Sequence, residues 1–295
     1  MVGLAQSMSV IGEDVTALLD QILAPVDGPR GRVIDAMRYA ALSGGKRLRP
    51  FLVVASADLF DVARRSALRT AAAIEMIHCY SLIHDDLPAM DDSDTRRGQP
   101  SAHKAFDEAT AILAGDGLLT EAFAVLADPA THPDPGVRIE LVAALARASG
   151  IAGMVGGQMI DMSPERDGFD LDGIDELQRL KTGALIGISC MSGAILGGAD
   201  AEEREALADY ERALGLAFQI VDALLDAEGT EEEIGKPVGQ DADLDKATFV
   251  KLLGHDGARA KAHELVMTAN KTLEVFGSKA QPLRDVATFV VDRRS

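Results

Sequence analysis

Apolar residues recur along the chain at intervals of three and four, which is the spacing of a helix that buries one face. Such stripes occupy Val15–Leu23, Ala71–Ile83, Ala109–Leu126, Val137–Ala146, Leu177–Leu196, Leu214–Leu225, Ala262–Phe276 and Leu283–Val291. Segments rich in Gly, Pro, Asp and Ser separate the stripes and predict loops at Pro25–Gly31, Ser43–Pro50, Pro88–Pro100, Asp128–Gly136, Ser163–Gly173 and Gly229–Asp245. The pattern predicts one all-α domain over residues 1–295, a helical bundle of about ten or more helices.

The composition agrees with a folded helical domain. Apolar residues make up 47% of the 295 positions, enough for a sizeable core. Aromatic residues are only 4%, and Trp is absent, which is a thin supply for a β-sheet protein. No low-complexity linker divides the chain.

The charge balance narrows the possible partners and the compartment. Acidic residues outnumber basic ones 47 to 29, giving a net charge of −18, so nucleic acid and anionic lipid are not expected ligands. Cys79 and Cys190 cannot build a disulfide framework and fit a reducing compartment. The first 25 residues lack the pattern of a signal peptide, and no uninterrupted apolar run reaches about 18 residues. We expect a cytoplasmic protein without membrane insertion.

An acidic segment follows one of the apolar stripes. Five carboxylates stand within Asp85–Asp94, at Asp85, Asp86, Asp91, Asp92 and Asp94. Like charges at this density repel one another unless water or cations neutralise them. A solvated turn would explain them, since Asp and Pro favour turns.

A second acidic group makes a metal site the stronger interpretation. Gln219, Asp222 and Asp226 are spaced to share one helix face, and two such helices could present carboxylates to each other across a bundle. Oxygen ligands alone indicate a hard cation, and Mg²⁺ commonly completes its shell with substrate phosphates. Zinc fits less well, because His84 is the only Cys or His candidate beside the acidic segment.

Five basic segments could hold the same anionic ligand. They are Ser43–Pro50, Arg96–Gly98, Lys181–Gly183, Gly235–Pro237 and Lys246–Thr248. Each alone is an ordinary solubilising charge. Beside two acidic helices, they indicate a site for two polyanions and metal ions. The segment Ser43–Pro50 is not a P-loop, and no motif for a nucleophilic triad is present.

The order of these motifs resembles that of the trans-prenyltransferases, the polyprenyl diphosphate synthases. The resemblance runs from Gly44-Gly45-Lys46-Arg47-Leu48-Arg49-Pro50 through Asp85-Asp86-x4-Asp91 and Phe218-Gln219-x2-Asp222-x3-Asp226 to the last basic segment. It covers residues 30 to 290, and Ser81–Phe123 is most similar to bacterial members that make farnesyl diphosphate. The family implies helices around a central cavity, usually in a homodimer. It also implies head-to-tail (1′–4) condensation of isopentenyl diphosphate with an allylic diphosphate.

The resemblance assigns roles residue by residue. It implies that two Mg²⁺ ions bind Asp85 and Asp91, with Asp86 a weaker candidate, and that a third binds Asp222 with support from Asp226. It implies that the allylic diphosphate is held by Arg96, Lys181, Thr182, Gln219, Lys236 and Lys246. It implies that isopentenyl diphosphate is held by Lys46, Arg49, His78 and Arg97. Of these, Asp85, Asp91, Arg96, Lys181 and Asp222 are expected to act in catalysis.

Three positions bear on activity and product length. The family usually has Asp where this chain has Ala223, so the third Mg²⁺ is expected to bind more weakly. Ser81 stands one turn before Asp85, and Tyr80 flanks it. The resemblance implies that a bulky residue at one of these two places forms the floor of the chain cavity. Tyr80 is bulky, so the expected product is C15 farnesyl diphosphate, with C20 geranylgeranyl diphosphate as the alternative.

Other functions stay open on sequence alone. A class I terpene cyclase shares Asp-rich helices and Mg²⁺ but has no isopentenyl diphosphate to hold at Gly44–Pro50. A non-catalytic subunit of a prenyl synthase would fit Ala223, although the complete first acidic segment opposes it. We interpret Met154, Met159 and Met162 as core residues.

Overall fold

The computed structural model describes residues 3–164, 168–228 and 249–292, and over these ranges the predicted all-α fold is confirmed. The α-helices are α1 (Leu4–Ile22), α2 (Gly31–Ala41), α3 (Leu48–Leu59), α4 (Arg64–Asp85), α5 (Ala102–Ala105), α6 (Glu108–Ala127), α7 (Pro135–Ser149), α8 (Met154–Asp161), α9 (Leu171–Gln178), α10 (Ala184–Gly197), α11 (Ala201–Glu228), α14 (Phe249–Thr272) and α15 (Gln281–Asp292). A π-helix, η2 (Arg179–Gly183), joins α9 to α10, and a 3₁₀ segment, η3 (Leu273–Ala280), joins α14 to α15.

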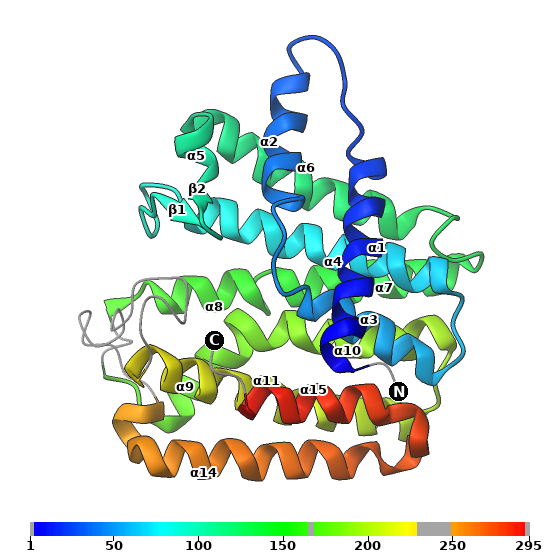
Figure 1. The fold of residues 1–295 in the computed structure, drawn as a ribbon, viewed down its shortest axis with the longest axis vertical. Coiled ribbons are helices and arrows are strands. Elements are labelled where there is room, and N and C mark those ends of the chain that lie inside the picture. The colour runs from blue at the N-terminus through cyan, green and yellow to red at the C-terminus, as the bar shows by residue number, and fades with distance from the viewer. Residues whose placement is uncertain (1–2, 165–167, 229–248, 293–295) are drawn as a thin grey trace.

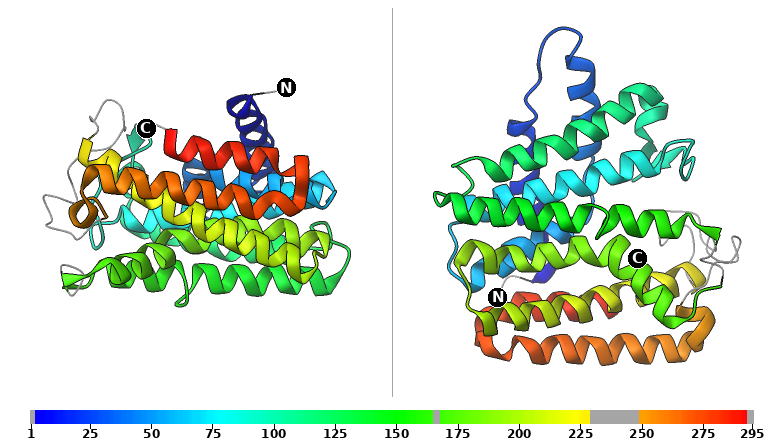
Figure 2. Two further views of the ribbon diagram at one scale, coloured as in Figure 1. Left: turned by 90° about the horizontal axis from the view of Figure 1, so that it is seen from below. Right: turned by 180° about the vertical axis from the view of Figure 1, so that it is seen from behind.

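The longer helices lie side by side in a bundle. Figure 1 shows α6, α4, α7, α10, α11 and α14 following one another down the molecule, while α1 and α2 run across them. Seen from below, α15 and α14 lie on one face and α7 with α10 on the opposite face, with α11 between them (Figure 2). The main apolar core includes buried residues from Ile11 in α1 to Val290 in α15. This continuity supports a single domain over 1–295, which stays a prediction.

The centre of the bundle is the contact between α3 and α10. Most residues of both helices are buried. A Cβ added to Gly193 of α10 would lie 2.2 Å from the carbonyl carbon of Ser56 in α3, so only glycine permits this approach. Because α3 is covered all round, it lacks the one-sided stripe that predicts a surface helix. The sequence pattern therefore missed it and extended the preceding loop to Pro50, whereas α3 begins at Leu48.

Two further elements differ from the sequence-based prediction. The expected loop Pro88–Pro100 contains a small antiparallel hairpin, β1 (Thr95–Arg96) with β2 (Gln99–Pro100). Its two turn residues, Arg97 and Gly98, have φ of 53° and 74°, and positive φ at both positions is the requirement of a type I′ turn. The predicted helix Leu177–Leu196 is interrupted by η2.

Surface apolar residues correct another expectation. Met154 is buried as predicted, but Met159 and Met162 are 62% and 50% exposed and are not core residues. On length and composition alone, three helical segments could cross a membrane: Glu108–Ala127, Pro135–Asp161 and Leu171–Gly197. The apolar runs in these segments are interrupted by polar residues and therefore did not meet the criterion of an uninterrupted run. The absence of membrane insertion stays a prediction.

Candidate active site

A cavity of about 380 Å³ brings together residues that are distant in the sequence. Six of the predicted site residues line it: Lys46, Arg49, His78, Arg96, Arg97 and Asp222. They come from the loop before α3, from α3, α4, the β1–β2 hairpin and α11. Apolar side chains complete the lining, among them Met8 from α1 and Phe289 from α15. Sequence reasoning missed these two, because nothing in the sequence shows that both ends of the chain return to this cavity.

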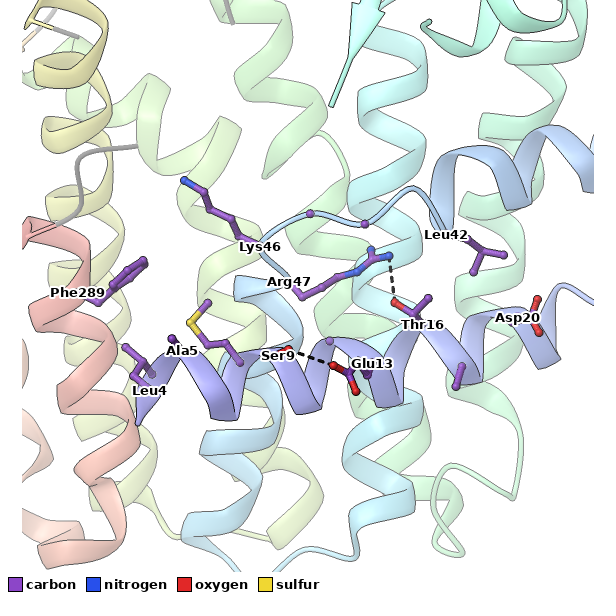
Figure 3. A pocket seen from close by; sticks show the side chains of 15 residues that line it. Leu4, Ala5, Ser9, Glu13, Thr16, Asp20, Leu42, Lys46, Arg47 and Phe289 are labelled. Atoms are coloured by element: carbon purple, nitrogen blue, oxygen red, sulfur yellow. Dashed lines mark hydrogen bonds between the residues drawn. The ribbon is translucent and has the colours of Figure 1, made fainter. Parts of the chain in front are cut away.

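The loop between α2 and α3 turns sharply enough to send neighbouring cations in different directions. The backbone angle φ is 84° at Gly44, 118° at Gly45 and 47° at Arg47. These positive values are ones that residues other than glycine rarely adopt. Figure 3 shows that the Lys46 and Arg47 side chains consequently point away from each other. The Arg97 guanidinium donates a hydrogen bond of 2.6 Å to the carbonyl oxygen of Gly44. We call Lys46, Arg47, Arg49 and Arg97 the basic cluster.

His78 and Arg49 lie deep within this positive environment. Burial, followed by the positive charges of Arg49 and Arg97, holds the pKa of His78 well below its ordinary value. The imidazole is therefore neutral at pH 7. Burial also lowers the pKa of Arg49, and the Glu75 carboxylate opposes that shift. The Arg49 Nε is buried without a hydrogen-bond partner, so a bound anion could satisfy it.

The end of α4 carries the first acidic segment. The chain folds back there, and the Asp91 amide donates a hydrogen bond of 2.8 Å to the carbonyl oxygen of Asp85. Burial raises the pKa of Asp85 to about 6, an effect that nearby Lys181 opposes and Asp91 reinforces. A carboxylate in this position gains stability from a cation.

The Asp86 side chain is paired with an arginine, Arg96. Its carboxylate is almost fully buried, and both oxygens accept hydrogen bonds from Arg96, with Nε distances of 3.0 and 3.2 Å. A bidentate pair of this kind holds Arg96 in place at the cavity. Asp86 is thus the least available of the three metal ligands predicted in this acidic segment, and its role in metal binding stays a prediction.

Lys181 is held by a carboxylate that the sequence argument did not select. Its Nζ lies 2.5 Å from Oδ2 of Asp161 at the end of α8. A Cβ on Gly157 would lie 2.3 Å from the Lys181 amide nitrogen, so this glycine lets α8 pack directly on η2. In the sequence, the glycine pair Gly156–Gly157 followed one turn later by Asp161 was the pattern that could have indicated this contact. We call Asp85, Asp91 and Asp161 the acidic cluster, with Lys181 between Asp161 and Asp85.

The second acidic motif lies on α11 as predicted. Asp222 and Phe218 face the 380 Å³ cavity, whereas Gln219 is buried and lines a separate groove of about 690 Å³ between α7, α10 and α11. The structure thus places Gln219 and Asp222 in different cavities. Thr182 lies on η2, partly buried. Lys236, Lys246 and the side chain of Asp226 lie outside what the structure describes.

The predicted chain-length residues lie within α4. Tyr80 is buried, and its ring meets His84 edge-on with centroids 5.7 Å apart. His84 Nε2 lies 3.1 Å from the carbonyl oxygen of Ile112 on α6, and a Cβ on Gly115 would lie only 2.1 Å from the same nitrogen. Gly115 therefore makes room for His84, which packs against Tyr80. The hydroxyl of Ser81 donates to the carbonyl oxygen of His78.

A larger apolar groove adjoins the basic cluster. Its volume is about 1,100 Å³, and it lies between α1, the loop after α2 and Phe289 of α15 (Figure 3). Leu4, Met8 and Leu42 supply much of its apolar lining, and Lys46 lies where it meets the 380 Å³ cavity.

The donor chemistry is that of a substrate-completed metal site. Across the described ranges, no three His, Cys, Asp or Glu residues are close enough to hold a metal ion by themselves. Asp85 and Asp91 offer oxygen ligands at one helix end. Because Mg²⁺ often takes one or two carboxylates and obtains other ligands from water and phosphate, these residues fit a metal that arrives with a diphosphate.

Comparison with known proteins agrees with this arrangement. Residues 31–279 match the family model for polyprenyl synthetase. The chain is 42% identical to farnesyl diphosphate synthase of Escherichia coli, covering 98% of each chain, and 41% identical to geranylgeranyl diphosphate synthase of Cyanophora paradoxa, covering 90% of each. A solved structure described as an FPP/GFPP synthase from Zymomonas mobilis superimposes with a TM-score of 0.89 at 49% identity, covering 97% of this chain and 98% of that one.

The fold and these matches define the class of the protein: the chain belongs to the polyprenyl synthetase family. The sequence-based predictions that the protein is a prenyltransferase and has an all-α isoprenoid synthase fold are confirmed.

Proposed function

We propose that this protein condenses isopentenyl diphosphate with dimethylallyl and geranyl diphosphate, in turn, to give farnesyl diphosphate. The observation that carries the proposal is the shared cavity, which joins five cations from distant parts of the chain to Asp222. One of these cations, Arg96, also lies near Asp85 and Asp91 of the acidic cluster. One substrate diphosphate lies against the basic cluster, where Lys46, Arg49 and Arg97 bind it with His78. The other lies at the acidic cluster.

The reaction needs no protein nucleophile. The bond between the allylic carbon and its diphosphate breaks, and the electron pair leaves with the diphosphate. The isopentenyl double bond attacks the resulting allylic cation, forming the new carbon–carbon bond. A proton then leaves the adjacent carbon to the departed diphosphate. Lys181 and Arg96 stabilise the charge on that leaving group because they lie where it accumulates.

Mg²⁺ is the cofactor that these residues fit, with up to three ions present when diphosphate is bound. Asp85 and Asp91 would hold two of them, and Asp222 with Asp226 would hold a third. When bound, the metal supplies Lewis-acid stabilisation of the leaving diphosphate. Thr182, Gln219, Lys236 and Lys246 are further candidates for the allylic diphosphate, and Ala223 leaves the third ion with one carboxylate fewer than is usual in the family.

Tyr80 supports a C15 product. Its ring is nearly fully buried and is held from below by His84. A fixed bulky ring beside Ser81, which lies one turn before Asp85, would stop the elongation of the prenyl chain. The alternative is a C20 product, since geranylgeranyl diphosphate synthases are also relatives. We expect Tyr80→Ala to lengthen the product from C15 to C20 with little change in rate, while unchanged product length would refute this floor.

The protein is proposed to act as a cytoplasmic homodimer. Ile112 and Leu113 on α6 and Ile139 on α7 are exposed apolar residues on neighbouring helices, as expected of an interface. Both cysteines are free and buried, which suits a reducing compartment. Light scattering of the purified protein tests the dimer.

The direct test of function is incubation with isopentenyl diphosphate, Mg²⁺ and each of the C5, C10 and C15 allylic diphosphates, with products sized by mass spectrometry. Condensation that ends at C15 supports the proposal. A C20 product keeps the reaction and overturns the chain length. Binding of diphosphate without condensation would instead indicate the non-catalytic subunit.

A further inference from the structure

Glu75 is a carboxylate that lines the 380 Å³ cavity among the cations of the basic cluster. It lies on α4, one turn before His78, and its side chain is only 2% exposed. Its Oε1 is 2.5 Å from Nη1 of Arg47 and 3.9 Å from Nη2 of Arg97. A buried carboxylate is costly unless it is paired, so Glu75 constrains the cations around it.

The contacts of Arg47 show what this pairing achieves. Its guanidinium also donates a 2.6 Å hydrogen bond to the carbonyl oxygen of Ala41 at the end of α2. Arg47 thus ties the start of α3 to both α2 and α4. Its left-handed backbone turns it away from Lys46 (Figure 3). Arg47 holds the loop through these contacts, and it lines the cavity together with Lys46 and Arg49.

Arg97 is fixed by the same group of contacts. It donates to the carbonyl oxygen of Gly44, and its guanidinium carbon would lie 2.8 Å from a Cβ on Gly45. Glu75 on one side and the glycine loop on the other therefore hold the hairpin arginine at the cavity wall.

We propose that Glu75 is a positioning residue for isopentenyl diphosphate: by holding Arg47 and Arg97 it sets the spacing of Lys46, Arg49 and Arg97 around that diphosphate. This inference rests on the proposed function. Replacing Glu75 would have two effects of opposite sign on the binding of the diphosphate. Removing a negative charge from a cation cluster should by itself tighten anion binding, whereas losing the arrangement of the cluster should weaken it.

The test is Glu75→Gln, which keeps the size of the side chain and removes its charge. We expect the Kd of isopentenyl diphosphate, measured by calorimetry without metal, to rise at least tenfold. In steady-state assays, KM for isopentenyl diphosphate should rise similarly, with KM for the allylic substrate within twofold and kcat within threefold. Glu211→Gln is the matched control, since it neutralises a glutamate in the separate groove and should leave both KM values unchanged.

A second variant tests the proposal in case Glu75→Gln does not fold. Arg47→Gln/Glu75→Gln removes both charges of the buried Arg47–Glu75 pair and should weaken isopentenyl diphosphate binding as much as Glu75→Gln, within twofold. Unchanged or tighter binding in the folded variants overturns the proposal, as does an equal rise in both KM values. A wild-type protein that binds isopentenyl diphosphate without condensing it would refute the proposed function, while the binding comparison still tests Glu75. A wild-type protein that does not bind it refutes the role of Glu75.

Discussion

The basic cluster that lines the cavity and the acidic cluster near Arg96 use opposite charges in the same way. In the basic cluster, one buried carboxylate, Glu75, pairs with Arg47 and Arg97 among the cations. In the acidic cluster, one cation, Lys181, lies between Asp161 and Asp85. Each cluster thus contains one residue of the opposite charge that pairs with its members. The basic cluster can bind a diphosphate directly, whereas the acidic cluster can do so only through a cation.

The largest expected effect comes from the acidic cluster. We expect Asp85→Asn to lower kcat about 10³-fold, because it removes a proposed ligand of the Mg²⁺ that would stabilise the leaving diphosphate. KM for isopentenyl diphosphate should stay within about threefold, since the basic cluster is untouched. Steady-state kinetics with each substrate varied separately checks this, and an unchanged kcat would refute the assignment of Asp85.

A smaller effect is expected from the carboxylate that holds Lys181. Asp161→Asn should raise KM for the allylic diphosphate about tenfold and leave KM for isopentenyl diphosphate unchanged, because Lys181 loses the carboxylate that holds it. This is the mirror image of Glu75→Gln. If both variants altered the same substrate, the separation into two clusters would be wrong.

The last expected effect is on folding stability and not on activity, and it lies outside both clusters. Burial raises the pKa of Glu211 to about 7, from an ordinary value of 4.5, and a Cβ on Gly187 would lie 2.6 Å from its carboxylate. The folded state therefore favours protonated Glu211. This contribution to stability is complete below pH 4.5 and is lost as the pH rises through 7.

Glu211→Gln removes that pH dependence. We expect the variant to be more stable than the wild type by about 2 kcal/mol at pH 8 and equal to it near pH 4.5. Thermal unfolding at the two pH values measures the difference, and condensation activity should not change. Equal stability at pH 8 would show that solvent already relieves the buried charge.

Sequence patterns predicted best where a helix has one buried face or where charged residues follow a motif. The α4 and α11 stripes and their carboxylates were found this way, and the cavity brings six predicted residues together. The pattern failed for α3, which is buried all round. It also missed Asp161 and Glu75, whose importance depends on partners that are distant in the sequence: Lys181 for Asp161, and Arg47 and Arg97 for Glu75.

The most direct test of the two-cluster account is to measure binding of each substrate with and without Mg²⁺. Calorimetry would compare isopentenyl diphosphate with a non-ionisable thio analogue of the allylic diphosphate, first in EDTA and then in excess Mg²⁺. The account predicts that isopentenyl diphosphate binds with the same affinity in both conditions, while the allylic analogue binds at least about 100-fold more tightly with Mg²⁺. Equal metal dependence of the two ligands would contradict it.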